Sequence, residues 1–274
     1  LSRSWAESTI CLKGVFRMQI NGIAAVITGG ASGLGGATSR ELAEAGAKIA
    51  ILDVNRNSGV KLADELGGVF VDCDVTKEQS AIDAFQLVEN QNGPIRLLVN
   101  CAGIAPMARI VRHSGPHDLK LFEDVIRVNL TGTFNCVRIA ATSMSKLDPQ
   151  GDGDRGVIIN TASVAGLEGT LGSVAYAASK AAVAGMTLPL ARDLAEYDVR
   201  VLAIAPGAFD TPMYDTIEKR AAQKMLKDVL SPKRMGRPQE FAKLVLHIIQ
   251  NQMLNGEVIR LDGGIRMPAT YSTT

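Results

Sequence analysis

A concentrated charge and a long apolar run are both missing from this sequence. Positive and negative charges nearly cancel, with 29 Lys and Arg against 28 Asp and Glu among 274 residues. A nucleic-acid-binding surface needs a basic block, so we expect no nucleic-acid partner. No uninterrupted apolar run reaches the roughly 18 residues that span a bilayer, and we therefore expect no membrane partner.

Cysteine and histidine are scarce and scattered. The sequence has four cysteines, none in a CxxC spacing, and three histidines without a ligand spacing. Scattered cysteines are typical of free thiols in a reducing compartment, so we expect a cytoplasmic protein, with the mitochondrial matrix as the alternative in a eukaryote. Because metal sites need clustered ligands, we expect no bound metal. These residues are Cys11, Cys73, Cys101, Cys136, His113, His117 and His247.

What is present is an alternation of short β-branched segments and longer helical patterns. Segments such as AAVIT and LLVN are apolar on both faces, which is typical of parallel strands covered by helices on both sides. Seven strands with crossover helices predict a single α/β domain, a Rossmann-type doubly wound parallel sheet. The expected strands are 24–28, 48–53, 69–72, 96–100, 156–161, 199–205 and 257–261. The expected helices lie near 33–46, 57–66, 77–91, 118–146, 175–196, 214–228 and 238–251.

The pattern begins after the first 17 residues. We expect residues 1–17 to be a flexible N-terminal extension, either a tag or a weak leader, because the segment lacks a continuous apolar stretch. The predicted domain spans residues 18–274. The polar stretch 148–155 reads as a surface loop between a helix and a strand.

The first strand runs into a glycine-rich turn, and a helical pattern follows. Glycines permit a tight turn and let backbone N–H groups approach a pyrophosphate, which the positive end of the helix also attracts. A glycine-rich segment alone is a weak indication, but in the first βα unit it predicts a dinucleotide site. The expected contacts in TGGASGLG are Thr28, Gly29, Ser32, Gly33, Leu34 and Gly35.

A carboxylate at the end of the second strand indicates which dinucleotide to expect. Asp53 stands 18 residues after Gly35, where its oxygens can accept hydrogen bonds from the adenosine ribose hydroxyls. Asp53 would also repel the 2′-phosphate of NADP, so we expect NAD. Arg56, three residues on, leaves a small opening for NADP, and an ordinary polar strand end is the alternative interpretation.

Two further strand ends suit cofactor contact. Asp74 and Val75 follow the third strand, where a side chain can hold the adenine amino group. The fourth strand ends in small residues that let the backbone pass close to a cofactor. Each feature alone is an ordinary transition from strand to loop. The residues after the fourth strand are Asn100, Cys101, Ala102 and Gly103.

A serine, a tyrosine and a lysine follow in a spacing that suits proton transfer. Ser163 follows the fifth strand, Tyr176 comes 13 residues later, and Lys180 lies four residues further on. Positions i and i+4 share one face of a helix, so both head groups can act on the same small molecule. A free tyrosine has a pKa of about 10, which a neighbouring ammonium and a nicotinium cation would lower. Tyr176 would exchange a proton with a substrate hydroxyl while hydride moves to or from nicotinamide. Ser163 would orient that oxygen, and Lys180 would also hold the nicotinamide ribose.

Together these motifs resemble the short-chain dehydrogenase/reductase family, from residue 20 to about residue 268. The matching segments are TGGASGLG, Asp53, Asp74-Val75, NCAG, RVNLTGTF, INTASVAG, YAASK and PGAFDTP. The resemblance implies that Asn129 completes a catalytic tetrad by holding a water linked to the lysine. It also implies substrate contacts at Ser163, Tyr176 and Phe209, and further cofactor contacts at Pro206, Gly207, Phe209 and Thr211. The family usually carries NNAG, and Cys101 replaces its second Asn. Because that position mainly supports the backbone, we expect activity to survive the change.

Longer segments are similar to one subgroup of the family. Its members oxidise 3-hydroxyacyl-CoA to 3-ketoacyl-CoA with NAD, and some act on branched-chain or steroid alcohols. The subgroup resemblance implies an acyl-CoA substrate and a homotetramer, with helices near 118–146 and 175–196 in a dimer bundle. The segments are AVITGGASGLG, VNCAGIA, GVIINTASVA, GMTLPLARDLA and LNGEVIRLDGGIRMP.

Two segments suit an anionic substrate with an apolar tail. The loop 104–117 combines Arg109 and Arg112 with apolar neighbours, and a substrate lid is expected over about 208–235. We expect the lid to close over the substrate and exclude water. Solvated helix faces are the commoner explanation for such charges. The lid offers Phe209, Met213, Tyr214, Lys219, Arg220, Lys224 and Met225.

Two other functions stay open. One is a 3-ketoacyl-carrier-protein reductase, or another carbonyl reductase or hydroxysteroid dehydrogenase. Such a carrier-protein reductase would use NADPH, which Asp53 disfavours. The other is a nucleotide-binding scaffold or sensor without turnover, which would have no need of the proton donor that Tyr176 supplies.

Overall fold

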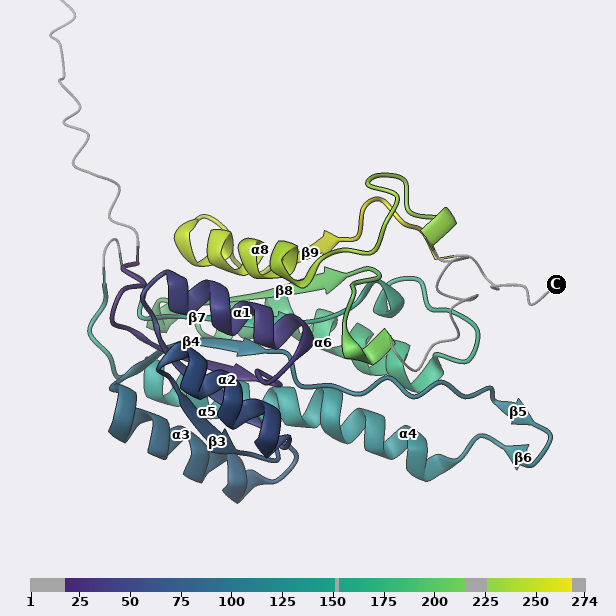
Figure 1. The fold of residues 1–274 in the computed structure, drawn as a ribbon, viewed down its shortest axis with the longest axis horizontal. Coiled ribbons are helices and arrows are strands. Elements are labelled where there is room, and N and C mark those ends of the chain that lie inside the picture. The colour runs from purple at the N-terminus through teal and green to yellow at the C-terminus, as the bar shows by residue number, and fades with distance from the viewer. Residues whose placement is uncertain (1–17, 151–152, 215–225, 268–274) are drawn as a thin grey trace, which may run out of the picture.

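Seven parallel strands form the central sheet of this computed structural model, which describes residues 18–150, 153–214 and 226–267 (Figure 1). The strand order is β3-β2-β1-β4-β7-β8-β9. The chain moves outward in one direction from β1 and in the other from β4, so a crevice forms at the carboxyl ends of these two strands. The strands are β1 (Ala24–Thr28), β2 (Lys48–Asp53), β3 (Val69–Asp72), β4 (Ile95–Asn100), β7 (Gly156–Thr161), β8 (Val199–Pro206) and β9 (Val258–Leu261).

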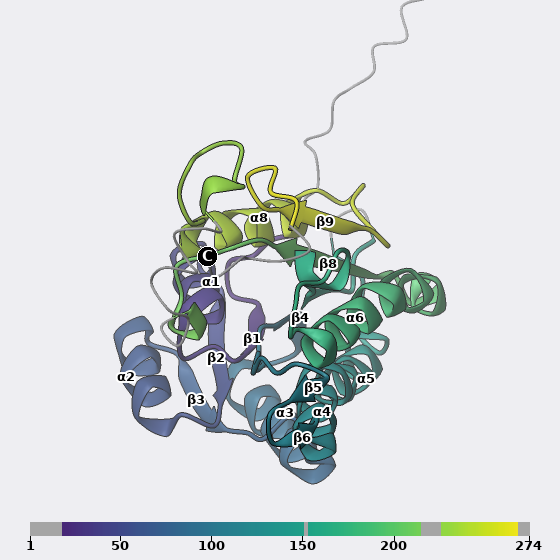
Figure 2. The ribbon, with the colours of Figure 1, turned by 90° about the vertical axis from the view of Figure 1, so that its right-hand side faces the viewer.

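Helices cover both faces of the sheet, as the doubly wound prediction requires (Figure 2). One face carries α1 (Gly33–Glu44), α2 (Arg56–Leu66) and α8 (Pro238–Gln250). The opposite face carries α3 (Glu78–Asn92), α4 (Leu119–Ile126), α5 (Thr133–Met144) and α6 (Val174–Asp193). The predicted fold class is therefore confirmed, and the predicted strand bounds differ from the observed ones by at most one residue.

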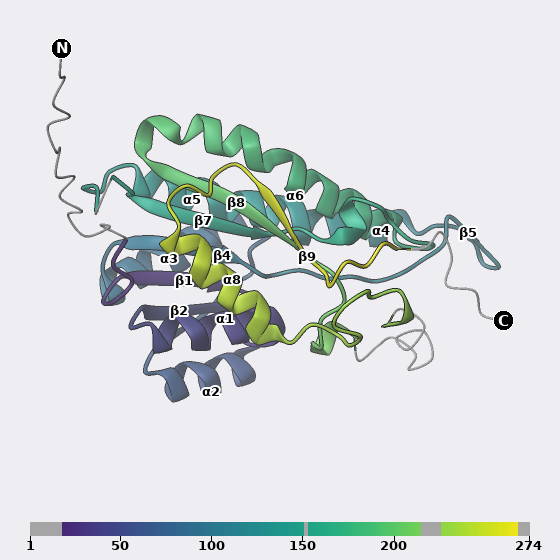
Figure 3. The same cartoon turned by 90° about the horizontal axis from the view of Figure 1, so that it is seen from above.

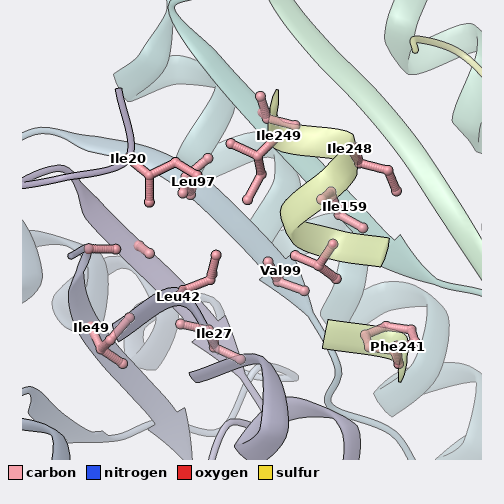
Figure 4. Close-up of a cluster of buried hydrophobic side chains, with 14 of the residues drawn as sticks. Ile20, Ile27, Leu42, Ile49, Leu97, Val99, Ile159, Phe241, Ile248 and Ile249 are labelled. Atoms are coloured by element: carbon pink, nitrogen blue, oxygen red, sulfur yellow. The ribbon is translucent and has the colours of Figure 1, made fainter. Parts of the chain in front are cut away.

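Alternation along the buried strands divides the core between the two faces. In β1, Ile27 packs with α1 and α8, whereas Val26 faces the layer of α3 and α5. The first layer includes Leu42 of α1 and Phe241 of α8, both fully buried (Figure 4). This two-sided burial explains why the middles of the strands are apolar, while most of their polar residues lie near the ends.

Strand register aligns the carboxyl ends at which the predicted site lies. Thr28 pairs with Leu52 on one side and with Asn100 on the other, and Asn100 pairs in turn with Asn160 of β7. The loops that leave β1, β2, β4 and β7 therefore start at one level of the sheet.

The predicted helix 118–146 is interrupted in the structure. Residues Arg127–Gly132 form a π-helical segment, η1, between α4 and α5. Such segments place one extra residue in a turn and often occur at functional sites. Asn129 lies inside η1, so the interruption falls on a residue expected to be catalytic.

The loop 104–117 contains a small hairpin that the sequence did not predict. Its strands are β5 (Val111–Arg112) and β6 (Gly115–Pro116), which pair antiparallel. Figures 1 and 3 show the hairpin projecting beyond α4 at one end of the molecule. We call residues 104–117 the arm. The expected extension 1–17 and the greater part of the expected helix 214–228 lie outside the described residues.

The interpretation of 148–155 as a plain surface loop is wrong at Asp154. The Asp154 carboxylate is buried and pairs with Arg200 of β8 at 3.0 Å. A buried charge needs such a partner, so this residue anchors the loop to the sheet.

One described helix, α6, is long and apolar enough to cross a bilayer by length and composition alone. Core helices of globular domains pass the same test, so the feature is a weak indication. Only 33% of its most apolar 18-residue window is buried, which leaves much of this apolar helix at the surface of the single chain.

Candidate active site

The glycine-rich turn between β1 and α1 depends on its glycines. Gly29 and Gly33 have φ angles of +62° and +52°, a region that side chains disfavour. A Cβ on Gly29 would lie 2.6 Å from the backbone nitrogen of Ala102, and one on Gly35 would collide with the carbonyl of Gly29. The turn thus brings bare backbone to the start of α1, which fits a phosphate-bearing group.

Asp53 lies at the carboxyl end of β2 beside this turn. Its Oδ2 accepts a hydrogen bond from the N–H of Ala31 at 3.1 Å, and its Oδ1 accepts one from Asn55 at 2.9 Å. Each carboxylate oxygen keeps a lone pair, so both can still accept a hydroxyl. The Arg56 guanidinium lies over the Phe70 ring, 6.0 Å from its centroid. The Asp53 carboxylate can therefore still accept hydrogen bonds from a ligand in the crevice.

The loops after β3 and β4 are held by local hydrogen bonds. Thr76 donates to Asp74 from its backbone at 3.0 Å and from its hydroxyl at 2.7 Å. Burial alone would raise the pKa of Asp74, but these hydrogen bonds and Lys77 hold that pKa below its usual value. Val75 is buried, and its carbonyl accepts from the Asn135 amide at 3.0 Å.

Buried polar side chains join the strand ends that border the crevice. The Thr28 hydroxyl donates to Asn100 Oδ1 at 3.1 Å, and Asn100 Nδ2 donates to Asn160 Oδ1 at 2.9 Å. Cys101 follows directly, and its Sγ accepts from the Thr161 hydroxyl at 3.6 Å. Burial raises the pKa of the Cys101 thiol to about 11, so the group stays neutral at physiological pH.

Ser163 and Tyr176 come together as the spacing predicts. Ser163 is 7% exposed and caps the short helix η2 (Val164–Gly166), where its Oγ accepts from the N–H of Ala165 at 3.1 Å. Tyr176 lies in the first turn of α6. Burial raises the pKa of Tyr176, and a hydrogen bond with the Ser163 side chain partly offsets that rise. The Ser163 side chain therefore lies near the Tyr176 hydroxyl.

Lys180 lies one turn further along α6 and is almost fully buried. Its Nζ donates to the carbonyl oxygen of Thr161 at 2.6 Å and lies 5.8 Å from the centroid of the Tyr176 ring. Burial lowers the pKa of Lys180 to about 8, with a small opposing effect from Cys101. The ammonium is thus close enough to stabilise a phenolate on Tyr176.

Asn129 faces the same helix from η1. Its Oδ1 accepts from the N–H of Ile104 at 2.8 Å, and its Nδ2 donates to the carbonyl of Ile104 at 2.9 Å. The Thr133 hydroxyl donates to the Asn129 carbonyl at 2.8 Å. The amide thus fixes the backbone that follows Gly103, while the expected water between Asn129 and Lys180 stays a prediction.

The segment after β8 contacts both the glycine-rich turn and the hydrophobic core. Thr211 lies 3.4 Å from the position that a Cβ of Gly33 would take, so it packs against the glycine-rich turn. Phe209 is 4% exposed and packs in the core beside a cavity of about 230 Å³. Its expected contacts with cofactor and substrate stay predictions. The lid residues 215–225 lie outside the described residues.

Three groups in or near the site were missed by the sequence prediction. They are the Ser179 hydroxyl, the Thr161 carbonyl and the ion-pair cluster of Glu168 with Arg260. Glu168, in the loop between Ser163 and Tyr176, accepts from Arg260 at 2.8 Å. Of these three groups, only Ser179 had a signal in the sequence, because it directly precedes Lys180 in YAASK. Across residues 18–150, 153–214 and 226–267, no group of three His, Cys, Asp or Glu is arranged to hold a metal.

Comparison with known proteins agrees with this geometry. Residues 23–222 match the family model described as short chain dehydrogenase. The human 3-hydroxyacyl-CoA dehydrogenase type-2 is 47% identical over 252 residues, which cover 90% of this chain and 97% of the human protein. A crystal structure of 3-hydroxyacyl-CoA dehydrogenase type-2 from Mycobacterium avium has a TM-score of 0.87 and 41% identity, covering 92% of this chain and 98% of that one. A Thermotoga maritima 3-oxoacyl-acyl-carrier-protein reductase is 36% identical, over 90% of this chain and 99% of its own length. The chain therefore belongs to the short-chain dehydrogenase/reductase family and is an oxidoreductase that acts on CH–OH groups with a nicotinamide cofactor.

Proposed function

We propose that this protein oxidises 3-hydroxyacyl-CoA to 3-ketoacyl-CoA with NAD. The observation that carries the chemistry is the nearness of the Ser163 side chain to the Tyr176 hydroxyl, together with Lys180 Nζ at 5.8 Å from the centroid of the Tyr176 ring. The substrate class is supported by similarity over nearly the whole chain to dehydrogenases of that name in human and Drosophila melanogaster, at 47% and 45% identity.

Tyr176 is the proton-transfer group in this proposal. During oxidation, the substrate hydroxyl gives its proton to the Tyr176 phenolate oxygen, and the C–H bond of the same carbon breaks with its electron pair. A nicotinamide bound in the crevice would supply the hydride acceptor. Ser163 donates a hydrogen bond to the substrate oxygen and keeps it beside Tyr176. In the reverse direction Tyr176 returns the proton to the carbonyl oxygen.

Lys180 makes the phenolate accessible near neutral pH. Burial by itself raises the pKa of Tyr176, which would leave the phenol protonated. A cation at the distance of Lys180 stabilises the phenolate and opposes that effect. The Thr161 carbonyl holds the Lys180 ammonium from the opposite side.

Preference for NAD over NADP follows from Asp53. Its carboxylate stands at the ribose end of the crevice, and the nearby Arg56 is engaged with Phe70. We expect kcat/KM with NAD to exceed that with NADP by roughly 100-fold, and Asp53→Ala to narrow this gap at least tenfold by removing the repulsion of a 2′-phosphate. Parallel measurements with both cofactors test this. Equal use of the two cofactors by the wild type would remove Asp53 from the proposal.

The arm provides a surface for an acyl-CoA. The N–H of Ala108 donates to the carbonyl of Gly172 at 2.9 Å, which joins the arm to the loop between Ser163 and Tyr176. Met107 and Leu171 are about half exposed on these two segments, and they suit an acyl chain. Arg109 and Arg112 on the arm suit the phosphates of coenzyme A.

We further propose a homotetramer in a reducing compartment, cytoplasm or mitochondrial matrix. The exposed apolar residues of α5 and α6, such as Phe134 and Leu188, support self-association. The described cysteines Cys73, Cys101 and Cys136 are free thiols, which suits such a compartment.

Absorbance at 340 nm with the purified wild type tests the proposed reaction. Acetoacetyl-CoA should be reduced by NADH at neutral pH, and 3-hydroxybutyryl-CoA should be oxidised by NAD faster at higher pH. The panel includes a steroid, a simple secondary alcohol and an acetoacetyl-carrier-protein. Turnover of the carrier-protein substrate with NADPH alone would favour the reductase, which the Thermotoga relative keeps as the second candidate. Absence of turnover on every short 3-ketoacyl-CoA would contradict the substrate assignment.

A further inference from the structure

Ser179 is a buried hydroxyl between the residues of the active site. It lies on α6 directly before Lys180 and is 0% exposed. Its Oγ accepts a hydrogen bond from Asn129 Nδ2 at 3.0 Å and donates one to the main-chain carbonyl of Tyr176 at 2.7 Å. One hydroxyl thus joins η1 to the turn of α6 that carries the proton-transfer residue.

The Asn129 amide has its hydrogen-bonding groups engaged within the protein. Its oxygen accepts from the N–H of Ile104, and its nitrogen donates to the Ile104 carbonyl and to Ser179. An amide nitrogen carries two hydrogens, so both are used. The Asn129 side chain therefore connects Ile104 to Ser179, and its oxygen keeps one lone pair beside the bond from Ile104.

The same connection borders the cofactor crevice. A Cβ on Gly103 would lie 3.2 Å from Asn129 Oδ1 and 3.7 Å from Lys180 Nζ. The backbone leaving β4, the Asn129 amide and the Lys180 head group are therefore packed together. A shift of α6 relative to η1 would move Tyr176 and Lys180 away from this wall.

We propose that Ser179 is a positioning residue, which fixes Tyr176 and Lys180 against the β4 loop through the chain Ile104–Asn129–Ser179–Tyr176. Without its hydroxyl, one Asn129 N–H is left unsatisfied in a buried site and the turn loses a contact between elements. Proton transfer requires the tyrosine within hydrogen-bond reach of the substrate oxygen. The role rests on the proposed Tyr176 chemistry but not on the identity of the substrate.

Ser179→Ala and Thr187→Val form the matched pair for the test. Thr187 lies on the same helix and is also 0% exposed, but its hydroxyl donates only within α6, to the carbonyl of Val183 at 3.0 Å. We expect Ser179→Ala to lower kcat by roughly 10- to 100-fold with little change in KM, because small misplacements of reacting groups carry such effects. The rise of kcat with pH should move to higher pH, since the phenolate is less well stabilised. Thr187→Val should leave kcat and its pH dependence unchanged.

A double-mutant cycle with Asn129→Ala separates positioning from general loosening. Residues in one hydrogen-bond chain are non-additive, so Ser179→Ala should add little to the loss caused by Asn129→Ala. Ser179→Cys keeps the size of the side chain with weak hydrogen bonding, and it should show the same loss even where Ser179→Ala does not fold.

Failure of the Ser179 role can be told apart from failure of the proposed substrate class. Any carbonyl compound that the wild type reduces serves as substrate, and failure of acetoacetyl-CoA alone counts against the substrate class only. Wild-type kcat and an unmoved pH profile in Ser179→Ala and Ser179→Cys would overturn the role of Ser179. Additive losses in the cycle would overturn it as well.

Discussion

At the scale of single residues, the candidate site gathers a few buried groups around the Tyr176 phenol. The Ser163 side chain lies near the Tyr176 hydroxyl, and Lys180, one turn further along α6, has its Nζ 5.8 Å from the ring centroid. Burial raises the pKa of the tyrosine and lowers that of the lysine, so both depart from their solution values. Such paired shifts are typical of groups that exchange protons with a substrate.

Tyr176→Phe tests the phenol directly. The change removes the proton donor and keeps the ring, so turnover should fall by roughly 10²- to 10⁴-fold while NADH binding is retained. Steady-state rates at 340 nm measure the first quantity, and NADH fluorescence titration measures the second. A wild-type rate in this variant would disprove the mechanism.

The buried Lys180 also makes stability depend on pH. Its pKa is lowered from 10.5 to about 8 in the folded chain, so between these values the unfolded chain holds a proton that the folded chain has released. Stability therefore rises as pH increases from about 8 to 10.5, by roughly 3 kcal/mol at most, since one pKa unit corresponds to about 1.4 kcal/mol.

Lys180→Met isolates this effect from other titrations. Urea unfolding at several pH values gives the free energy of unfolding of the cofactor-free wild type and variant. The wild-type value minus the variant value should rise as pH increases from about 8 to 10.5. A difference that stays flat or falls with pH would contradict a lowered lysine pKa in the folded state.

Sequence spacing predicted that Ser163, Tyr176 and Lys180 lie together, but not the hydrogen bonds that hold them in place. Ser163, Tyr176 and Lys180 follow from a serine after a strand and an i, i+4 pair on a helix. The bond from Ser179 to Asn129 joins residues 50 positions apart, and the Lys180 partner is a main-chain carbonyl. Neither has a residue-type signature, because the first depends on how η1 is placed against α6 and the second on how β7 is placed against α6.

At the scale of elements, apolar patterning predicted the strands of the sheet but not the π-helical turn or the β5–β6 hairpin. Strands buried on both faces, such as β1, read as continuous apolar segments. The π-helical turn at Arg127–Gly132 adds one residue to an otherwise regular helix, a change that hydrophobic periodicity does not register. The β5–β6 hairpin consists of two-residue strands with a largely exposed surface, so no alternation marks it.

Arg200 illustrates a support between elements that lies away from the reaction. It pairs with buried Asp154 and donates to the carbonyl of Ile248 near the end of α8 at 3.0 Å and to that of Leu254 in the following loop at 2.9 Å. It is the second residue of β8 and so lies at the amino end of the strands, away from the carboxyl ends that border the candidate site.

Arg200→Met should lower the free energy of unfolding by roughly 3–5 kcal/mol, because it leaves Asp154 buried without its partner. Urea denaturation measures this loss, and kcat of the folded protein should stay near that of the wild type. The control Arg40→Met breaks the exposed Arg40–Glu65 pair, which solvent screens, and should lower the free energy of unfolding far less than Arg200→Met. Similar losses in the two variants would show that burial does not govern the Arg200 pair.

At the scale of the whole molecule, the single chain leaves an apolar helix partly uncovered. α6 carries apolar residues around its circumference, yet Leu188 is 44% exposed and Phe134 on neighbouring α5 is 48% exposed. The inner face of α6 carries Tyr176 and Lys180. A second copy packed on the outer face would therefore also hold the catalytic helix in place.

Leu188→Asp tests whether this face lies between subunits. A carboxylate buried in an apolar contact is strongly unfavourable, so the variant should shift from a tetramer to a smaller species in light scattering after size exclusion. Leu87→Asp on α3, 39% exposed in the single chain, is the matched control and should keep the wild-type mass. If α6 is held by the partner, Leu188→Asp should also lose activity on dilution, whereas Leu87→Asp should not. A wild-type mass for Leu188→Asp would place the contact elsewhere, and a monomeric wild type would contradict the assembly itself.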